Sequence, residues 1–417
     1  MMKEIFQTPR DGYHYFNGYY DKSPLSHDNR YLLALRTKIF DKMPDGVNDL
    51  VEVGYFDLLN ESGFYKIDEN QAFNWQQGNM LQWIGYSEFS CGYNVLKDGD
   101  YFLRIKDIFT KDFVDYPIPA YSISPCGSHY VSVNFKRHTL LRPGYSYSCI
   151  KDDKHKSTLD FVKLCELNSN KVTELFNISA FDTLSDIKGG LSYIEHCMYC
   201  KTNPKRFLFY LRNKTEASIN TKLFWYDLNK KKIHEIKGAT RVTHANWVDE
   251  DNIIFWGATH NATNTIYHFL SRAPAILRFL LKIYRFFIKG NGQDGNSRLS
   301  SALTGDSYKI YTISTQSFKD VATKISVDGH PSMHPLNSEL LITDSYPNKD
   351  SISRLMLYNI KEDNFIESRN IDSSPEINNS PFRCDLHPKV SNDGNHVIID
   401  SSDGGYRSIK IFQINAY

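Results

Sequence analysis

A short motif, a polar turn followed by an apolar strand, recurs along the whole chain. Six copies share Asn, Asp, Gly or Pro in the turn and aliphatic or aromatic residues after it, at residues 26–33, 124–131, 201–208, 248–255, 334–341 and 391–398. A seventh and less regular copy covers residues 97–103. Tight turns favour these turn residues, and the short apolar runs that follow are typical of buried strands.

A second strand follows most copies and ends in an Asp or Asn turn, as in residues 223–229 and 355–360. Strand, turn and strand recur at intervals of roughly 45–70 residues with no helical pattern between them, which is the signature of a β-propeller. We therefore expect an all-β fold, a single seven-bladed β-propeller over residues 1–417. Each blade would pack on its neighbours, and the ring would close by pairing the two ends of the chain.

Residues 269–289 break this pattern. The segment is strongly apolar, contains no acidic residue, and places Arg278, Lys282 and Arg285 on one face of a helix. We predict an amphipathic helical insertion over residues 269–289 that continues as a polar loop to residue 300. Such a helix suits an anionic membrane surface, with its cations at the lipid phosphates. The alternative is a helix packed on the propeller rim or on a partner subunit.

Composition narrows the classes of function. The 49 Lys and Arg residues nearly balance the 48 Asp and Glu residues, so no overall field favours nucleic acid as a partner. The seven cysteines are irregularly spaced, which argues against a disulfide framework and for a reducing compartment. The first ten residues do not read as a secretory signal. With residues 269–289, these features predict a cytoplasmic protein attached peripherally to the inner face of the membrane.

Histidines gather where the motif predicts the central channel. Propellers bind ligands where their innermost strands converge, and the residues just before each turn motif should lie near that channel. Five such places share this position, at residues 19–22, 195–196, 243–244, 329–330 and 384–387, and four of them carry a histidine. Scattered histidines would not show this regularity, so we expect a functional site in the channel.

Four of these channel residues form a chemically sensible metal site. They are His244, His330, Cys384 and His387, the last two only three positions apart. Zinc prefers nitrogen and sulfur ligands in a tetrahedral arrangement, so the set predicts Zn²⁺. Asp344 could replace one ligand or orient a histidine. The alternative is that these side chains hydrogen-bond only to one another and to water.

A second group is basic and aromatic and favours a carboxylate-bearing sugar. It consists of Tyr19, Tyr20, Arg137, Arg142, Tyr145, His196 and Arg212. Arginine binds carboxylates through paired hydrogen bonds, and tyrosines stack on sugar rings and transfer protons. β-Elimination at a uronic acid needs such a cation, together with a base and an acid. The alternative is that Arg142 and Tyr145 only brace a long loop.

Several longer motifs of this chain lie at residues 18–24, 77–83, 142–145, 243–247, 328–332, 343–347 and 383–388. They resemble, in the same order, motifs of the seven-bladed propeller lyases of the ulvan-lyase type. More distantly, the chain is similar to the oligogalacturonate lyases. The resemblance implies a metal near the last blades, structural in the ulvan-type enzymes, and elimination at a uronic acid. In oligogalacturonate lyases a Gln-x-x-His pair helps to bind the metal. Cys384-x-x-His387 has that spacing, with a cysteine that would favour zinc over manganese.

The predicted function is therefore β-elimination on an acidic, uronate-containing polysaccharide or its precursor. We expect Arg142 and Arg212 to neutralise the carboxylate, and Tyr145 and His196 to transfer protons. Substrate binding would involve the residues Tyr19, Tyr20, Asp21, Lys22 and Arg137.

The chain departs from those lyases at two points. No histidine occurs between His27 and His129, where the lyases use paired histidines, and Leu211 precedes Arg212 where relatives carry a histidine. A different class of function is therefore the alternative. It is a non-catalytic propeller that binds glycans or scaffolds a membrane-associated system of surface-polysaccharide assembly.

Overall fold

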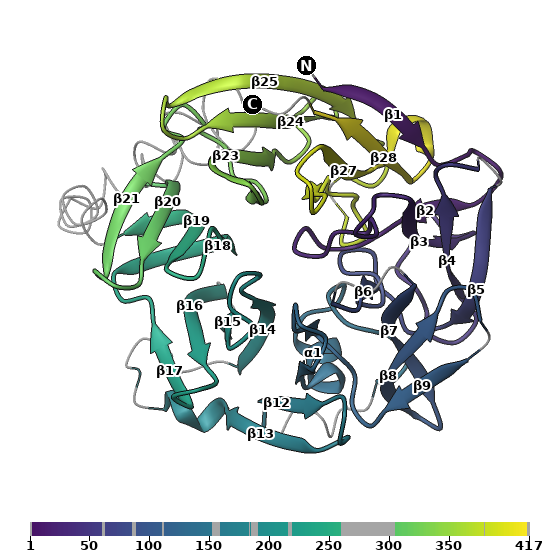
Figure 1. Ribbon diagram of the computed structural model, residues 1–417, viewed down its shortest axis with the longest axis horizontal. Helices are drawn as coiled ribbons and strands as arrows, with labels where there is room; N and C mark the ends of the chain where they lie inside the picture. The colour runs from purple at the N-terminus through teal and green to yellow at the C-terminus, as the bar shows by residue number, and fades with distance from the viewer. Residues whose placement is uncertain are drawn as a thin grey trace, which may run out of the picture.

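The chain forms seven four-stranded antiparallel sheets arranged in a ring (Figure 1). This computed structural model describes residues 2–414 apart from residues 61–62, 86–88, 111, 152–158, 183, 185–190, 216–218, 260–304 and 379. Each sheet is one blade. In six blades the strands follow one another in chain order from the axis outward, and in the seventh the first strand of the chain is the outermost. The prediction of an all-β, seven-bladed propeller is confirmed.

The strands divide evenly among the blades. The first blade consists of β2 (His14–Phe16), β3 (Tyr31–Thr37), β4 (Val51–Asp57) and β5 (Phe64–Asn70), and the second of β6 (Gln82–Trp83), β7 (Ser90–Lys97), β8 (Asp100–Asp107) and β9 (Phe113–Tyr116). The third blade consists of β10 (Ser122–Ile123), β11 (His129–Val133), β12 (Phe161–Glu166) and β13 (Val172–Asn177). The fourth consists of β14 (Leu191–Tyr199), β15 (Arg206–Lys214), β16 (Ile219–Asp227) and β17 (Lys232–Glu235). Blades five to seven consist of β18 (Ala239–Trp247), β19 (Asn252–Thr259), β20 (Ser307–Thr312) and β21 (Ser317–Val321); β22 (Ser332–His334), β23 (Asn337–Asp344), β24 (Ile352–Asn359) and β25 (Asn364–Asp372); and β26 (Lys389–Val390), β27 (His396–Ser401), β28 (Ser408–Gln413) and β1 (Lys3–Gln7).

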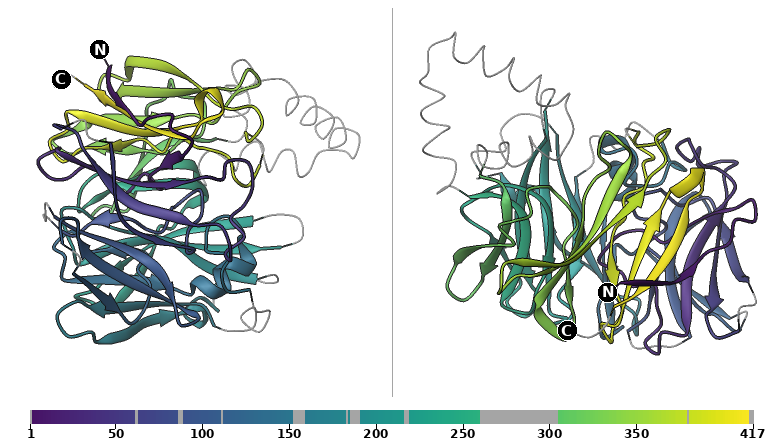
Figure 2. Two further views of the ribbon diagram at one scale, coloured as in Figure 1. Left: turned by 90° about the vertical axis from the view of Figure 1, so that its right-hand side faces the viewer. Right: turned by 90° about the horizontal axis from the view of Figure 1, so that it is seen from above.

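The two ends of the chain close the ring by sharing the seventh blade. β1 pairs antiparallel with β28, with Lys3 opposite Gln413 and Gln7 opposite Lys410. Figure 2 shows these two strands side by side. A propeller closed in this way leaves no open edge between its first and last blades.

The apolar core is divided among the interfaces between blades. Leu35 of the first blade packs in one cluster with Tyr93 of the second, and Tyr210 of the fourth packs with Phe255 of the fifth. Strands covered on both faces by neighbouring blades need apolar residues at nearly every position. β3 illustrates this, since only Arg36 of its seven residues is not buried.

Within the described part of the chain one α-helix interrupts the strands, against the expectation of a helix-free repeat. α1 (Phe135–Leu141) follows β11 in the third blade. The Asn134 side chain caps it by accepting a hydrogen bond from the Arg137 N–H at 3.1 Å. Two 3₁₀ helices, Ile178–Phe181 and Asp403–Gly405, complete the helical segments of the described chain. Arg142 is the C-cap residue of α1, so the helix positions that arginine for the site described below.

The predicted amphipathic helix at 269–289 lies outside the described residues. Among the residues that are described, no helix is long and apolar enough to cross a membrane. Binding of residues 269–289 to an anionic membrane therefore stays a prediction. Pelleting with anionic vesicles, and its loss when Arg278, Lys282 and Arg285 are replaced by Glu, would measure it.

Candidate active site in the central channel

The channel histidines of β14 and β18 lie at bulges, where the regular pairing of the innermost strand with its neighbour is interrupted. In β14 the pairing with β15 skips from Glu195 to Met198, and His196 between them has a positive φ of 55°. In β18 the pairing skips from Val242 to Ala245, across His244. Such bulges re-aim side chains and recur beside functional sites. The regular spacing of histidines before the turn motifs thus corresponds to one repeated position in the blades.

The loop after β2 enters the centre of the ring (Figure 1). Tyr19 and Tyr20 belong to this loop. The Tyr19 ring stacks on His196 at 4.7 Å between centroids and meets the His387 ring edge-on at 5.0 Å. The Tyr20 ring lies 5.1 Å from that of His330. Both tyrosines are buried, so they join histidines of different blades into one packed assembly.

The structure brings His330 and His387 together with Asp385. Their potential ligand atoms all lie within 4.8 Å of one another, and all three residues are buried. We call these three residues the histidine group. His330 Nδ1 lies 3.0 Å from both carboxylate oxygens of Asp344, which leaves Nε2 for a ligand. The Asp344 carboxylate also accepts the backbone N–H of His387 at 3.2 Å and so orients both histidines.

The histidine group fits a divalent metal. His387 Nε2 is buried and has no hydrogen-bond partner within the described part of the chain, which is costly for a polar atom unless a ligand satisfies it. His387 also holds a positive φ of 45°, a strained conformation that is enriched at ligand sites. Two imidazole nitrogens and a carboxylate suit Zn²⁺ and Mn²⁺ alike, so the donor set itself does not select zinc.

Two of the predicted metal ligands lie outside this group. The Cys384 thiol packs against the buried Arg407 instead, and burial raises the pKa of this thiol to about 12. Asp385 takes the place expected for Cys384. The His244 ring is 4.2 Å from the His330 ring, but its Nδ1 lies 3.0 Å from Asp328 Oδ1.

Metal binding should therefore depend on Asp385 and not on Cys384. After incubation with Mn²⁺ or Zn²⁺ and desalting, elemental analysis should find one ion per chain in the wild type and in Cys384→Ser. We expect metal affinity to fall about tenfold or more in Asp385→Asn, since an amide is a weaker ligand than a carboxylate. Loss of metal in Cys384→Ser with full retention in Asp385→Asn would contradict this arrangement.

A second cluster centres on Glu195, whose side chain is fully buried. Arg212 forms an ion pair with this carboxylate, Arg142 Nε lies 3.3 Å from it, and His138 Nε2 lies 3.1 Å from it. We call these four residues the arginine group. Burial acts to raise the pKa of Glu195, but Arg142 and Arg212 outweigh it and hold the pKa well below its usual range. The single negative charge of Glu195 faces the two positive charges of Arg142 and Arg212, so the group has a net positive charge that can attract an anion.

Tyr145 connects the two groups. The Arg142 guanidinium lies over the Tyr145 ring at 4.1 Å, and this ring meets His196 edge-on at 5.9 Å. The Tyr145 hydroxyl accepts a hydrogen bond from Arg383 at 3.4 Å, and Arg383 also pairs with Asp385 at 2.9 Å. The predicted residues Arg142, Tyr145, His196 and Arg212 thus meet beside the histidine group.

His196 uses both ring nitrogens for contacts within the protein. Nδ1 lies 3.2 Å from the Gln77 amide nitrogen, and Nε2 lies 3.5 Å from Glu195 Oε1. The amide can only donate and the carboxylate can only accept, so Nε2 carries the proton. Burial lowers the pKa of His196 well below its usual value and keeps the ring neutral. With its only lone pair engaged by Gln77, this imidazole is poorly placed as a base.

The remaining predicted substrate residues lie elsewhere. Asp21 and Lys22 form a buried ion pair at 2.6 Å and line a separate pocket. Arg137 is buried and pairs with Asp160 at 3.3 Å. Asp160 also accepts the backbone N–H of Ile194 at 2.8 Å, so the pair fixes α1 to β14.

Sequence reasoning assigned no role to six residues of the site, namely His138, Glu195, Asp328, Tyr346, Arg383 and Asp385. A signal for three of them was present, because each acid stands one or two positions before a channel histidine. The Tyr346 hydroxyl lies 3.3 Å from His244 Nε2. Only the blade geometry reveals that contact, because the two residues are far apart in the chain.

Comparison with known proteins supports the fold. No family model matches the chain, and no curated protein matches its sequence. The chain is similar to the solved structure of an oligogalacturonate lyase in complex with manganese, with a TM-score of 0.64, 10% identity, and coverage of 100% of this chain and 96% of that one. It is also similar to an oligogalacturonate lyase from Vibrio parahaemolyticus, with a TM-score of 0.62, 11% identity, and coverage of 100% and 97%.

The fold and the comparison define the chain as a seven-bladed β-propeller protein. At such low identity the likeness concerns the fold alone. The oligogalacturonate lyases are the more distant of the two families noted in the sequence, and the finer assignment to the ulvan-lyase type stays a prediction.

Proposed function

We propose that this propeller cleaves an acidic, uronate-containing oligosaccharide or polysaccharide by β-elimination. The observation that carries the proposal is the meeting of the arginine group and the histidine group around Tyr145 in the channel. A cationic cluster, a metal-capable cluster and a tyrosine hydroxyl in one place are what elimination next to a carboxylate requires. The similarity in fold to two oligogalacturonate lyases supports the same reaction class.

Arg142 and Arg212 bind the uronate carboxylate in this proposal. Glu195 fixes both guanidinium groups at one end, and Arg212 also donates to the Thr221 hydroxyl at 3.2 Å. The N–H groups outside these contacts would bind a second carboxylate. Neutralising that carboxylate makes the neighbouring C5 proton more acidic. A divalent metal held by His330, Asp385 and His387 would supply further stabilisation of the negative charge.

His244 removes the C5 proton, and Tyr145 protonates the leaving oxygen. Asp328 holds His244 Nδ1 at 3.0 Å, so Nε2 carries the lone pair and accepts a hydrogen bond from the Tyr346 hydroxyl at 3.3 Å. The substrate would displace this hydroxyl, which can rotate away, before His244 takes the proton. As the C5–H bond breaks, its electrons form the C4=C5 double bond and the C4–O bond breaks. The departing oxygen takes the Tyr145 proton. His244 thus takes the proton-transfer role predicted for His196, which instead supports Glu195 and Tyr19.

An ultraviolet assay tests this function, because elimination creates an unsaturated uronate that absorbs in the ultraviolet. We expect absorbance to rise when the protein and Mn²⁺ are incubated with at least one polymer of a uronate panel. In Tyr145→Phe the rate should fall about 10²-fold or more, because the general acid is lost while the ring remains. No rise with any polymer would favour a non-catalytic glycan-binding propeller.

A further inference from the structure

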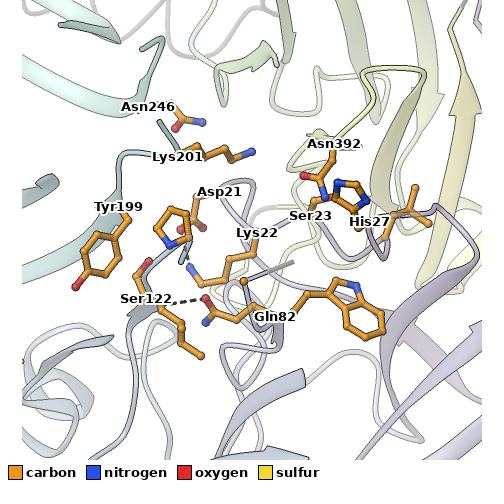
Figure 3. A pocket seen from close by; sticks show the side chains of 15 residues that line it. Asp21, Lys22, Ser23, His27, Gln82, Ser122, Tyr199, Lys201, Asn246 and Asn392 are labelled. Carbon is orange, nitrogen blue, oxygen red and sulfur yellow. Dashed lines mark hydrogen bonds and ion pairs between the residues drawn. The ribbon is translucent and has the colours of Figure 1, made fainter. Parts of the chain in front are cut away.

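A separate pocket lies on the channel beyond the histidine group. It has a volume of about 180 Å³, and its walls include Asp21, Lys22, Ser23, Lys201, Asn246 and Asn392 (Figure 3). We call it the far pocket. An adjoining pocket of about 120 Å³ shares Ser23, Lys201 and Asn246 with it. Both are small compared with the roughly 300–1,000 Å³ of pockets for drug-sized ligands, so one small ring fits best.

Strand direction places the far pocket at the end of the channel opposite to the histidine group. All innermost strands run the same way, because every blade repeats one order from the axis outward. His330 and His387 precede their strands β22 and β26, whereas Lys201 and Asn392 follow β14 and β26. Tyr19 and Tyr20 pack among the histidines, and the chain then continues directly into Asp21 and the far pocket.

The polar groups of the far pocket match a ligand that both donates and accepts hydrogen bonds. Asp21 Oδ2 pairs with Lys22 Nζ at 2.6 Å, but Asp21 Oδ1 and Ser23 Oγ are shielded and have no hydrogen-bond partner within the described residues. An unpaired buried carboxylate oxygen is costly, and only a donor can satisfy it. A bare anion such as phosphate brings acceptors for lysine but offers a carboxylate no suitable partner.

The opposite wall supplies donors. Figure 3 shows the Lys201 side chain reaching across the pocket between Asn246 and Asp21, with Asn392 on the side of His27. An ammonium group and amides can donate to ring or hydroxyl oxygens. Trp83 adds an aromatic side chain to the lining of the pocket. Acceptors, donors and an aromatic surface in a space for one ring are the chemistry of carbohydrate recognition.

We propose that the far pocket is a second carbohydrate-binding site, which takes one hydroxyl-rich sugar ring. Sugar hydroxyls would donate to Asp21 and Ser23 and accept from Lys201. The site stands apart from the arginine and histidine groups, so it does not depend on elimination as the reaction. It would allow the protein to hold a saccharide end at one mouth of the channel while the other mouth binds uronate.

Saturation-transfer NMR on the full chain tests the site. The probes are the methyl glycosides of glucose, galactose and rhamnose, together with glucuronate, so that neutral and acidic rings are compared. We expect at least one probe to bind, and Lys201→Met to weaken it by about tenfold or more through loss of a charged donor. Asn392→Ala should also weaken binding. Lys205→Met changes an exposed lysine of the same turn outside the pocket and should leave binding unchanged.

Three results would overturn the proposal. The first is that no probe binds the wild type. The second is that binding of the neutral methyl glycosides is lost in Arg212→Gln but kept in Lys201→Met, which would place the neutral ring at the arginine group; glucuronate is left out of this comparison because the proposed function has it bind that group. The third is that inorganic phosphate binds the far pocket while none of the sugars does.

Discussion

Replacing Glu195 by Gln is expected to lower the free energy of unfolding by about 3–5 kcal/mol, because it leaves two buried guanidinium groups without their shared carboxylate. Arg212, Arg142 and His138 all converge on this side chain, which is fully buried. Urea denaturation followed by tryptophan fluorescence measures the change. The matched control is Glu235→Gln, which breaks a partly exposed pair with Lys222 and should cost about 1 kcal/mol or less.

The pH dependence of this loss follows from the lowered pKa of Glu195. Although burial alone would raise that pKa, the two arginines hold it well below the usual value. The stabilisation by ionised Glu195 is therefore complete above the unfolded-state pKa of about 4.3 and is lost as pH falls through the folded-state value. The difference between wild type and Glu195→Gln should be constant near neutral pH and narrow in acid. A difference that grows in acid, or one no larger than the control, would contradict the buried pairing.

Arg212→Gln is expected to reduce kcat/KM for uronate cleavage by about 10²–10³-fold, the usual effect of removing one charged group that stabilises a developing negative charge. The substitution leaves Arg142 paired with Glu195, so the fold should survive. Arg212→Lys keeps the charge but not the planar fork, and should recover only part of the rate. Initial rates from the absorbance of the unsaturated product give the comparison.

A control on the same strand separates chemistry from folding. Arg206 is the first residue of β15, the strand that also carries Arg212. Its guanidinium lies at the surface and donates to the Glu250 carbonyl at 2.6 Å. Arg206→Gln should keep wild-type kcat/KM. Equal kcat/KM values for Arg212→Gln and the wild type would show that Arg212 does not bind the substrate carboxylate.

Periodic features of the sequence predict the fold well. In six blades the turn-and-strand motif marks the turn into the second strand, because these blades repeat the same buried strands. The less regular copy at residues 97–103 instead joins β7 to β8, the second and third strands of its blade. The channel histidines were predictable for the same reason, since His196, His244, His330 and His387 hold one repeated position before or within the innermost strands.

Contacts between distant blades were not predictable from local spacing. Glu195 meets Arg142 only because α1 turns the chain toward β14, and nothing in the repeat predicts α1. Arg212 reaches Glu195 from β15, the neighbouring strand of the same blade. Cys384 and Asp385 both stand close to His387, and the local backbone path decides which of them faces His330.

The loop after β2 gives a third example. It changes partners within two residues, so Tyr20 packs on His330 while Lys22 lines the far pocket. A four-residue motif that looks like one substrate-binding element is therefore divided between two sites. Only the path of the loop through the channel separates them.

The most direct test of elimination is the mass of the products formed in water labelled with heavy oxygen. Elimination breaks the C4–O bond and forms a double bond without consuming water, so the masses of the products, measured before reducing ends exchange oxygen with the solvent, should add up to that of the substrate with no heavy oxygen. Hydrolysis would place one solvent oxygen in each pair of products. Labelled products, or an absence of products from every uronate polymer tested, would contradict the proposed lyase.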